Sequence, residues 1–182
     1  CKKGAKEVMC SGSVFKGKGA EDMRVVHTFL PVCDEQSEIL ILGTFPSVKS
    51  REGEFYYHHP QNRFWRVMAA ILEQPVPQSI AEKKDMLLRG KIALWDVIAA
   101  CEIEGSADSS IRDVTPNDIG ALVTQTSIRR IFCNGTKAYE LYRKYCAKTC
   151  PVNAVRLPST SPANAAWSLE RLIQEWKSIV FS

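Results

Sequence analysis

The sequence has only three histidines, no C-x-x-C pair and no long apolar run, and these absences exclude several classes of protein. A helix that crosses a bilayer needs about 20 consecutive, mostly apolar residues, so we expect no membrane-spanning segment. The seven cysteines are odd in number and lack the spacing of a disulfide framework or a zinc site. They favour reduced thiols in an intracellular protein, which would be cytoplasmic if the source is prokaryotic.

Several catalytic motifs are also missing. There is no G-x-S-x-G nucleophile elbow, no Walker phosphate loop and no zinc deaminase pattern of H-x-E with P-C-x-x-C. His58 and His59 are adjacent, and His27 is the only other histidine, so convergence on one metal ion is not expected. We predict that the protein uses no metal and no organic cofactor, and that His58 and His59 make hydrogen bonds within a loop.

What is present suits one globular domain. The 182 residues are 45% hydrophobic and 24% charged, and the net charge of +4 permits an anionic partner such as DNA without requiring one. Residues 1–22 are rich in Gly, Lys and Ser and lack periodicity. We interpret residues 1–22 as a flexible basic tail or a non-native extension, and residues 23–182 as the single domain, with Met23 a plausible native start.

Short apolar runs alternate with helical patterns along the rest of the chain. The runs have the length of buried strands and lie at 39–42, 92–95, 131–133 and 152–157. Apolar residues at helical spacing follow around 65–72, 80–87, 138–146 and 169–180. Strands that alternate with helices predict parallel pairing and a layered α/β sheet.

Unusual residues collect directly after these four strands. In open parallel sheets, ligands bind beyond the carboxyl ends of the strands. The segments at that edge are 44–62, 96–111, 134–136 and 158–164. We therefore expect four separate loops to converge on one site.

The first of these segments contains the stretch FYYHHPQNRFW, residues 55–65. It combines aromatic residues with hydrogen-bonding groups such as Asn62, which is typical of a pocket wall. A loop of this length without a helical pattern is uncommon unless it serves a site. The alternative is a structural loop with aromatic packing.

Two further segments each have two interpretations. Asn134-Gly135 between a strand and a helix is typical of a turn, although the Asn134 amide could also meet a ligand. In LPSTSPANA, residues 157–165, we expect Ser161 to cap a helix that has Pro162 at its first position. That segment would be an ordinary capped helix or, with its free N–H groups and hydroxyls, a phosphate site.

Taken together, GTFPS, FYYHHPQNRFW, NG and LPSTSPANA resemble the motifs of the uracil-DNA glycosylase superfamily, and within it the hypoxanthine-DNA glycosylase (DNA-deoxyinosine glycosylase) branch. The resemblance covers roughly residues 27–180. It implies a three-layer sandwich with a central, mostly parallel four-stranded sheet flanked by helices. Two positions depart from the pattern: Phe45 stands where relatives carry a water-positioning Asn or Asp, and His58 replaces a glycine expected in this branch.

The resemblance also assigns roles to residues. Asn62 would be the catalytic residue, which orients water or hydrogen-bonds the base. If Asn62 proves not to be catalytic, Asp96 or Asp108 are the next candidates, apart from the resemblance. The residues that would bind the flipped base are Phe45, Tyr56, Tyr57 and Asn134. The residues that would hold the DNA backbone are Ser47, Ser159, Thr160, Ser161 and Asn164.

The leading hypothesis is a monofunctional glycosylase that hydrolyses the N-glycosidic bond of deaminated bases in DNA, foremost hypoxanthine. Its partner would be DNA that contains such bases, and we expect a monomer. Two alternatives remain open at this point. One is specificity for uracil or mismatches, and the other is a non-catalytic protein that binds damaged DNA or nucleotides, because the first motif lacks an acidic catalyst.

Overall fold

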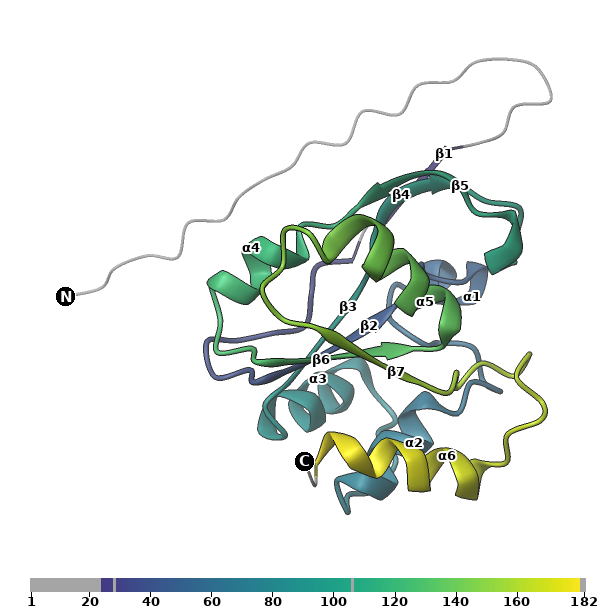
Figure 1. Ribbon diagram of the computed structural model, residues 1–182. Coiled ribbons are helices and arrows are strands. Elements are labelled where there is room, and N and C mark those ends of the chain that lie inside the picture. The colour runs from purple at the N-terminus through teal and green to yellow at the C-terminus, as the bar shows by residue number, and fades with distance from the viewer. Residues whose placement is uncertain (1–23, 28, 106, 181–182) are drawn as a thin grey trace.

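A four-stranded parallel sheet forms the centre of the computed structural model, which describes residues 24–27, 29–105 and 107–180 (Figure 1). The proposed tail 1–22 and Met23 lie outside the described residues. The strand order is β3-β2-β6-β7. The bounds of these strands are Ile39–Gly43 for β2, Ile92–Asp96 for β3, Arg130–Asn134 for β6 and Ala154–Leu157 for β7. The four strands and their parallel pairing confirm the predicted fold class.

Helices cover both faces of this sheet and complete three layers (Figure 1). One face carries α2 (Phe64–Ile71), α3 (Ile80–Arg89) and α6 (Leu169–Trp176), and the other carries α4 (Ile119–Thr124) and α5 (Thr136–Leu141). Strand β2 is buried along its whole length because its side chains alternate between the two layers. Ile39 and Ile41 pack with α2, α3 and α6, whereas Leu40 and Leu42 pack with α4 and α5.

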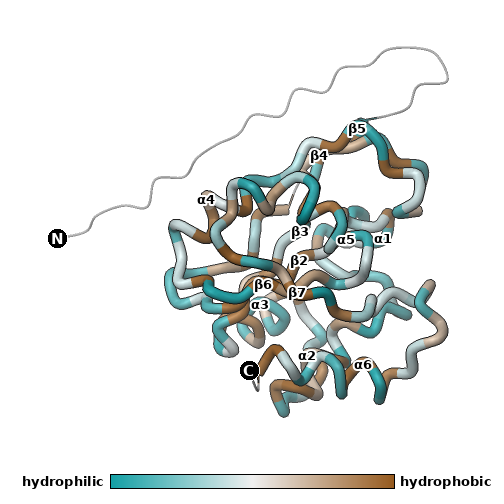
Figure 2. The backbone as a smooth tube through the Cα atoms, viewed as in Figure 1, coloured by the Kyte–Doolittle hydropathy of each residue, from teal (hydrophilic) through white to brown (hydrophobic). Residues whose placement is uncertain are grey.

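The helix boundaries follow from local capping chemistry. The α3 helix begins with a capping box: the Ser79 hydroxyl accepts from the Glu82 backbone N–H, and the Glu82 carboxylate accepts from the Ser79 backbone N–H. Ser168 caps α6 in the same way, by accepting from the N–H of Arg171. Figure 2 shows hydrophobic residues along α2 and α6 and hydrophilic residues in many of the connecting loops. The predicted helices therefore exist, although α5 and α6 end before their apolar patterns do.

The helical pattern at 138–146 contains a change of helix type. After α5 ends at Leu141, residues Tyr142–Cys146 form a π-helical turn, η2. The Tyr142 hydroxyl in this turn donates to the carbonyl of Val152. A 3₁₀ turn, η3 (Lys177–Ile179), similarly extends α6.

A second, antiparallel sheet was not predicted. It has the order β1-β4-β5, with β1 at Arg24–Val26, β4 at Ile98–Glu102 and β5 at Arg112–Pro116. The expectation that 96–111 forms only a loop is therefore wrong. Only Val97 separates β3 from β4, so the apolar run continues from one sheet into the other without a turn signal.

Two short helices also differ from the expectation. The segment 44–62 contains α1 (Val48–Glu52), and a 3₁₀ turn, η1 (Asp108–Ser110), precedes β5. Neither has enough residues for an apolar period to be recognised. None of the helices in the described ranges has the length and apolar composition that a bilayer span requires.

Trp176 connects α6 to the loop that follows β7, and it provides a test of this packing. Its side chain is fully buried, contacts Phe64 edge-on and donates from Nε1 to the Pro158 carbonyl at 3.0 Å. We expect Trp176→Ala to lower the free energy of unfolding by about 3–5 kcal/mol because it leaves a cavity. Trp176→Phe should cost about 1–3 kcal/mol because the Pro158 carbonyl loses its donor.

Urea denaturation followed by circular dichroism would measure these changes. The matched control is Gln174→Ala on the exposed side of α6, which should change stability by no more than about 0.5 kcal/mol. A loss below about 1 kcal/mol for Trp176→Ala would contradict the placement of α6 in the cooperative core.

Candidate active site

A cavity of about 440 Å³ opens at the carboxyl ends of the parallel strands. All four predicted segments contribute to its wall, which confirms their convergence. Its volume lies in the range of small-molecule sites. The predicted site residues that line it are Phe45, Ser47, Tyr56, Tyr57, Asn62, Asn134, Ser159, Thr160 and Ser161. Asn164 is not a lining residue, but its side chain donates to the carbonyl of the lining residue Ser159.

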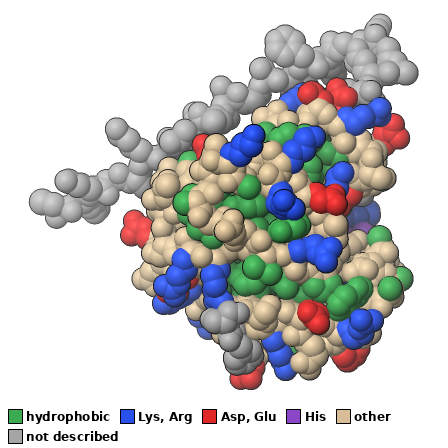
Figure 3. All heavy atoms as spheres, in the orientation of Figure 1, with side chains coloured by type: hydrophobic (Ala, Val, Ile, Leu, Met, Phe, Trp, Pro, Cys, Tyr) green, Lys and Arg blue, Asp and Glu red, His purple; other side chains and the backbone are tan. Residues whose placement is uncertain are grey.

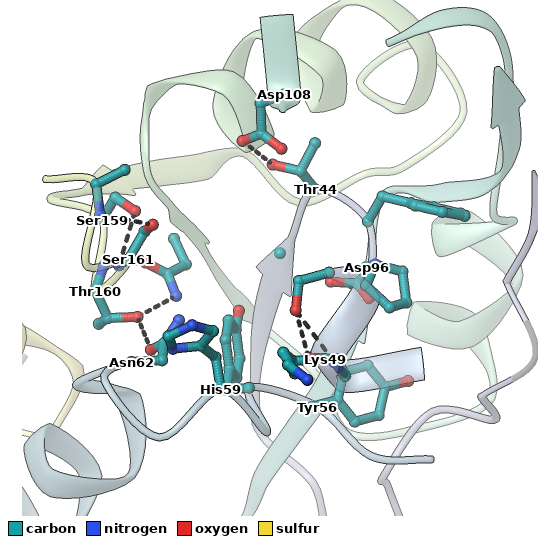
Figure 4. A pocket seen from close by; sticks show the side chains of 18 of the residues that line it. Thr44, Lys49, Tyr56, His59, Asn62, Asp96, Asp108, Ser159, Thr160 and Ser161 are labelled. Atoms are coloured by element: carbon teal, nitrogen blue, oxygen red, sulfur yellow. Dashed lines mark hydrogen bonds between the residues drawn. The ribbon is translucent and has the colours of Figure 1, made fainter. Parts of the chain in front are cut away.

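Thr160 connects the two candidate asparagines (Figure 4). The Asn134 amide donates from Nδ2 to Thr160 Oγ1 at 2.9 Å, and its Oδ1 accepts from the Thr160 backbone N–H at 2.9 Å. The Thr160 hydroxyl in turn donates to Asn62 Oδ1 at 3.0 Å. The backbone N–H of Phe64 also donates to Asn62 Oδ1, at 2.9 Å. Both lone pairs of this oxygen are thereby used, and the Asn62 N–H groups are left for a ligand.

The turn after β6 makes this network possible. Gly135 has a φ of +99°, and a Cβ atom there would come within 3.0 Å of the Ser159 side chain. Only glycine combines this backbone angle with such a close approach. Asn134-Gly135 is therefore both a turn, as its composition indicates, and the point where two loops meet.

Arg63 fixes the loop that follows β7. Its guanidinium donates to the carbonyls of Thr160, Ser161, Asn164 and Trp167. The prediction of a helix from Pro162 is wrong, because residues 161–167 form turns and the next helix, α6, starts at Leu169. The carbonyls of Ser161 and Asn164 accept both from Arg63 and from backbone N–H groups three residues on, in turns that do not continue as a helix.

Serine side chains organise the remaining turns. Ser159 Oγ accepts from the N–H of Ser161, and Ser161 Oγ accepts from the N–H of Ala163, so these N–H groups already have partners in this structure. Asn164 donates from Nδ2 to the Ser159 carbonyl at 2.9 Å. Ser47 caps α1 by accepting from the N–H of Ser50. Each of these side chains shapes a loop that borders the cavity.

Aromatic residues form another part of the wall. Phe45 is buried, and its ring meets the His27 ring edge-on at 6.0 Å. Tyr56 donates its hydroxyl to the Leu30 carbonyl at 3.0 Å, so this hydroxyl is bound to the chain itself. Tyr57 stacks on Phe64 with ring centroids 4.1 Å apart. Its hydroxyl is buried and receives no hydrogen bond of regular geometry from the described residues, although the Asn134 side chain lies near enough to lower its pKa.

Two carboxylates complete the cavity. Asp96, at the end of β3, is buried and pairs with His27 Nε2 at 2.8 Å. The Asp108 carboxylate accepts from Thr44 Oγ1 at 3.4 Å. Burial of the carboxyl raises the pKa of Asp108, while the Thr44 hydrogen bond opposes this. Asp96 ends β3 and Asp108 begins η1 after β4, so both lie in the predicted segment 96–111.

Sequence reasoning missed the roles of His27 and Arg63. His27 lies 69 residues before Asp96, and no local pattern announces their contact. Arg63 stands inside the FYYHHPQNRFW stretch, so its position was visible, but its carbonyl partners lie about 100 residues away. His59 also lines the cavity, and its Nδ1 accepts from the N–H of Gln61, as expected for a loop histidine. The described residues contain no group of three or more side chains suited to hold a metal ion.

Comparisons with known proteins agree with this geometry. A hypoxanthine DNA glycosylase from Methanosarcina acetivorans is 38% identical over 155 residues, which cover 83% of this chain and 95% of the relative. A hypoxanthine DNA glycosylase from Methanosarcina barkeri is 39% identical over 115 residues, covering 62% of this chain and 72% of the relative.

Among solved structures, the solution NMR structure of a candidate uracil DNA glycosylase from Methanosarcina acetivorans is similar. It has a TM-score of 0.74 and 36% identity, and the match covers 86% of this chain and 96% of that one. The family model of the uracil DNA glycosylase superfamily matches residues 30–179. The matched range contains all the residues that line the cavity and nearly all of the described fold. The chain therefore belongs to the uracil DNA glycosylase superfamily.

Proposed function

We propose that this protein is a monofunctional DNA repair glycosylase that removes hypoxanthine from deoxyinosine in DNA. The observation that carries the proposal is the fixed Asn134–Thr160–Asn62 network in a cavity of suitable size, in a chain whose curated relatives are named hypoxanthine DNA glycosylases. In the reaction, water oxygen bonds to C1′ as the C1′–N9 bond breaks. The base leaves with the bonding electron pair, and the proton released by the water neutralises it.

Asn62 is the proposed catalytic residue because of the direction of its amide. Its Oδ1 already accepts from Thr160 and from the Phe64 N–H, so only its N–H groups remain to act on substrate. A fixed donor stabilises negative charge that develops on the leaving base or orients the attacking water.

Phe45 determines whether the reaction depends more on activation of water or on stabilisation of the leaving base. It stands at the position where relatives carry a water-positioning side chain, and a phenyl ring cannot orient water. The enzyme must therefore depend on stabilisation of the leaving group. We propose that Phe45, Tyr56 and Tyr57 contact the flipped base, which offsets part of the cost of its unstacking.

The loops around the cavity are the proposed contact with the DNA backbone. Ser47, Ser159, Thr160 and Ser161 border the opening, and Asn164 supports them. Figure 3 shows Lys and Arg side chains on the face that carries α5 and β7. In the chain, Arg143 and Lys144 of η2 and Arg156 of β7 are exposed. Such cations provide the salt-dependent part of DNA affinity. We further propose that residues 23–182 act as one monomeric domain on intracellular DNA.

The first prediction concerns Asn62. Asn62→Ala should reduce the single-turnover rate of hypoxanthine release by about 10²–10³-fold, because it removes a donor at the reacting centre. Asn62→Asp should lose a similar factor, since it keeps the acceptor for Thr160 and Phe64 but not the N–H donor. Duplex affinity should stay within about threefold, because most affinity comes from phosphate contacts.

The matched control for this experiment is Gln61→Ala, which removes a neighbouring exposed amide that does not line the cavity. Rates would be measured with a labelled duplex that contains one deoxyinosine. Wild-type turnover by Asn62→Ala would move catalysis to another residue, with Asp96 or Asp108 the next to test.

The second prediction concerns the choice of base. Hypoxanthine offers an acceptor at O6 and a donor at N1–H, and adenine offers the reverse at both positions. A buried polar group without a partner costs about 1–3 kcal/mol, so two mismatches should protect adenine strongly. We expect hypoxanthine release to exceed uracil release, because the smaller base gains less from stacking and no side chain at position 45 orients water.

Release would be compared in duplexes that differ only in deoxyinosine, deoxyuridine or deoxyadenosine at one position. Equal or faster release of uracil would favour the alternative of a uracil-directed enzyme, which the name of the similar NMR structure also suggests. Tight binding of the deoxyinosine duplex without any release would favour a non-catalytic sensor of damage.

A further inference from the structure

Two oxygen atoms converge at the end of β2, in the wall of the cavity that Gly43 and Asp96 line. A Cβ atom on Gly43 would lie 2.2 Å from Asp96 Oδ1 and 2.9 Å from the Tyr57 hydroxyl oxygen. The absence of a side chain at Gly43 therefore leaves room above its Cα for both groups. The Tyr57 hydroxyl, as noted, is buried without a hydrogen bond of regular geometry to the described residues, and a nearby Asn134 N–H would leave the hydroxyl proton available to a ligand.

The Tyr57 hydroxyl is held as a hydrogen-bond donor. Burial is the main cause that raises the pKa of Tyr57, and the nearby Asp96 raises it further, while the Asn134 side chain acts in the opposite direction. The group therefore keeps its proton at neutral pH. The ring cannot turn away easily, because it is stacked on Phe64 at an interplanar angle of 23°.

Asp96 Oδ1 is held as an acceptor by its contact with His27. The N–H of Phe29 donates to His27 Nδ1 at 3.0 Å, so in the neutral ring the proton is on Nε2. Nε2 then donates to Asp96 Oδ2 at 2.8 Å, and the other carboxylate oxygen is left above Gly43. The side chains of His27 and Asp96 are only 2% and 5% exposed, which makes the arrangement rigid.

A donor and an acceptor side by side are complementary to the edge of one kind of purine. We infer that the Tyr57 hydroxyl donates to O6 of hypoxanthine and that Asp96 Oδ1 accepts its N1–H. This inference rests on the proposed function. The O6 and N1 edge lies on the far side of the purine from the sugar, and Figure 4 shows Asp96 across the cavity from Asn62, Thr160 and Ser159. A base whose sugar faces Asn62 therefore points this edge toward Asp96 and Tyr57.

The same pair distinguishes related bases. Adenine places an acceptor at N1 against the Asp96 carboxylate, which repels it. Guanine carries the same O6 and N1–H as hypoxanthine, so its exclusion must depend on the space available to its 2-amino group. His27 contacts no atom of the bound base in this arrangement. It is a positioning residue, since it fixes which oxygen of Asp96 is free.

The test compares two bases that differ only at this edge. Duplexes would carry either deoxyinosine or deoxynebularine, whose purine base lacks the 6-oxo group and has an unprotonated N1. Uncleavable 2′-fluoro forms of both give the binding preference as a ratio of affinities. The wild-type protein should prefer the deoxyinosine form at least about tenfold, because each unpaired buried group weakens binding by about that factor.

Tyr57→Phe and Asp96→Asn should each reduce this preference. Tyr57→Phe should lower it about tenfold without loss of thermal stability, since the hydroxyl makes no hydrogen bond of regular geometry to the described residues. In Asp96→Asn, His27 Nε2–H should retain the amide oxygen, so that an N–H group faces N1 in place of an acceptor. The preference should then vanish or reverse. The control is Tyr142→Phe, whose hydroxyl bonds to Val152 in the layer that contains α5: its melting temperature should fall while the preference stays unchanged.

The outcomes separate this inference from the proposed function. The inference would be overturned if Tyr57→Phe and Asp96→Asn both kept the wild-type ratio of affinities for the deoxyinosine and deoxynebularine duplexes. A loss in Asp96→Asn that is equal for both bases would also overturn it, because the carboxylate would then act on water or on the sugar. Failure of the wild-type protein to release hypoxanthine from ordinary deoxyinosine would reject the proposed function but leave the binding ratios interpretable.

Discussion

The hydrogen bonds of Thr160 are the interaction on which the site depends. Thr160 uses its backbone N–H and its hydroxyl to join the end of β6 to the loop after β7, and its hydroxyl also orients Asn62. Its carbonyl accepts from both the backbone N–H and the side chain of Arg63. Three segments far apart in sequence thus share one fully buried residue, so none of them can move independently of the others.

The sequence was sufficient to predict the central sheet because each buried strand is a continuous apolar run. It was also sufficient to predict that the segments after these strands would meet, which is a property of parallel sheets in general. It was insufficient where one run passed from β3 into β4 without a turn residue. The helix expected from Pro162 failed for a different reason, since Arg63, remote in sequence, binds several carbonyls of this segment while its backbone forms separate turns.

Individual site residues could be named from the sequence, but their partners could not. Asn62 and Asn134 stand out as polar residues next to apolar runs, yet the hydroxyl that connects them belongs to Thr160, 98 residues after Asn62. The pair His27–Asp96 is equally remote in sequence. The roles of the individual residues remain proposals. They follow from which hydrogen-bonding atoms are already used within the protein and which are left.

Arg63 has a consequence that extends beyond the loop it holds. Its guanidinium is bound by carbonyl dipoles, and no ion pair to a carboxylate accompanies it within the described ranges. A cation whose counter-charge is only a set of dipoles keeps a positive long-range field. The field acts at the loop that borders the cavity, where it would attract a polyanion before any contact forms. Arg63 can thus accelerate encounter with DNA even though its nitrogen atoms are occupied by the protein, and this acceleration should weaken as ionic strength rises.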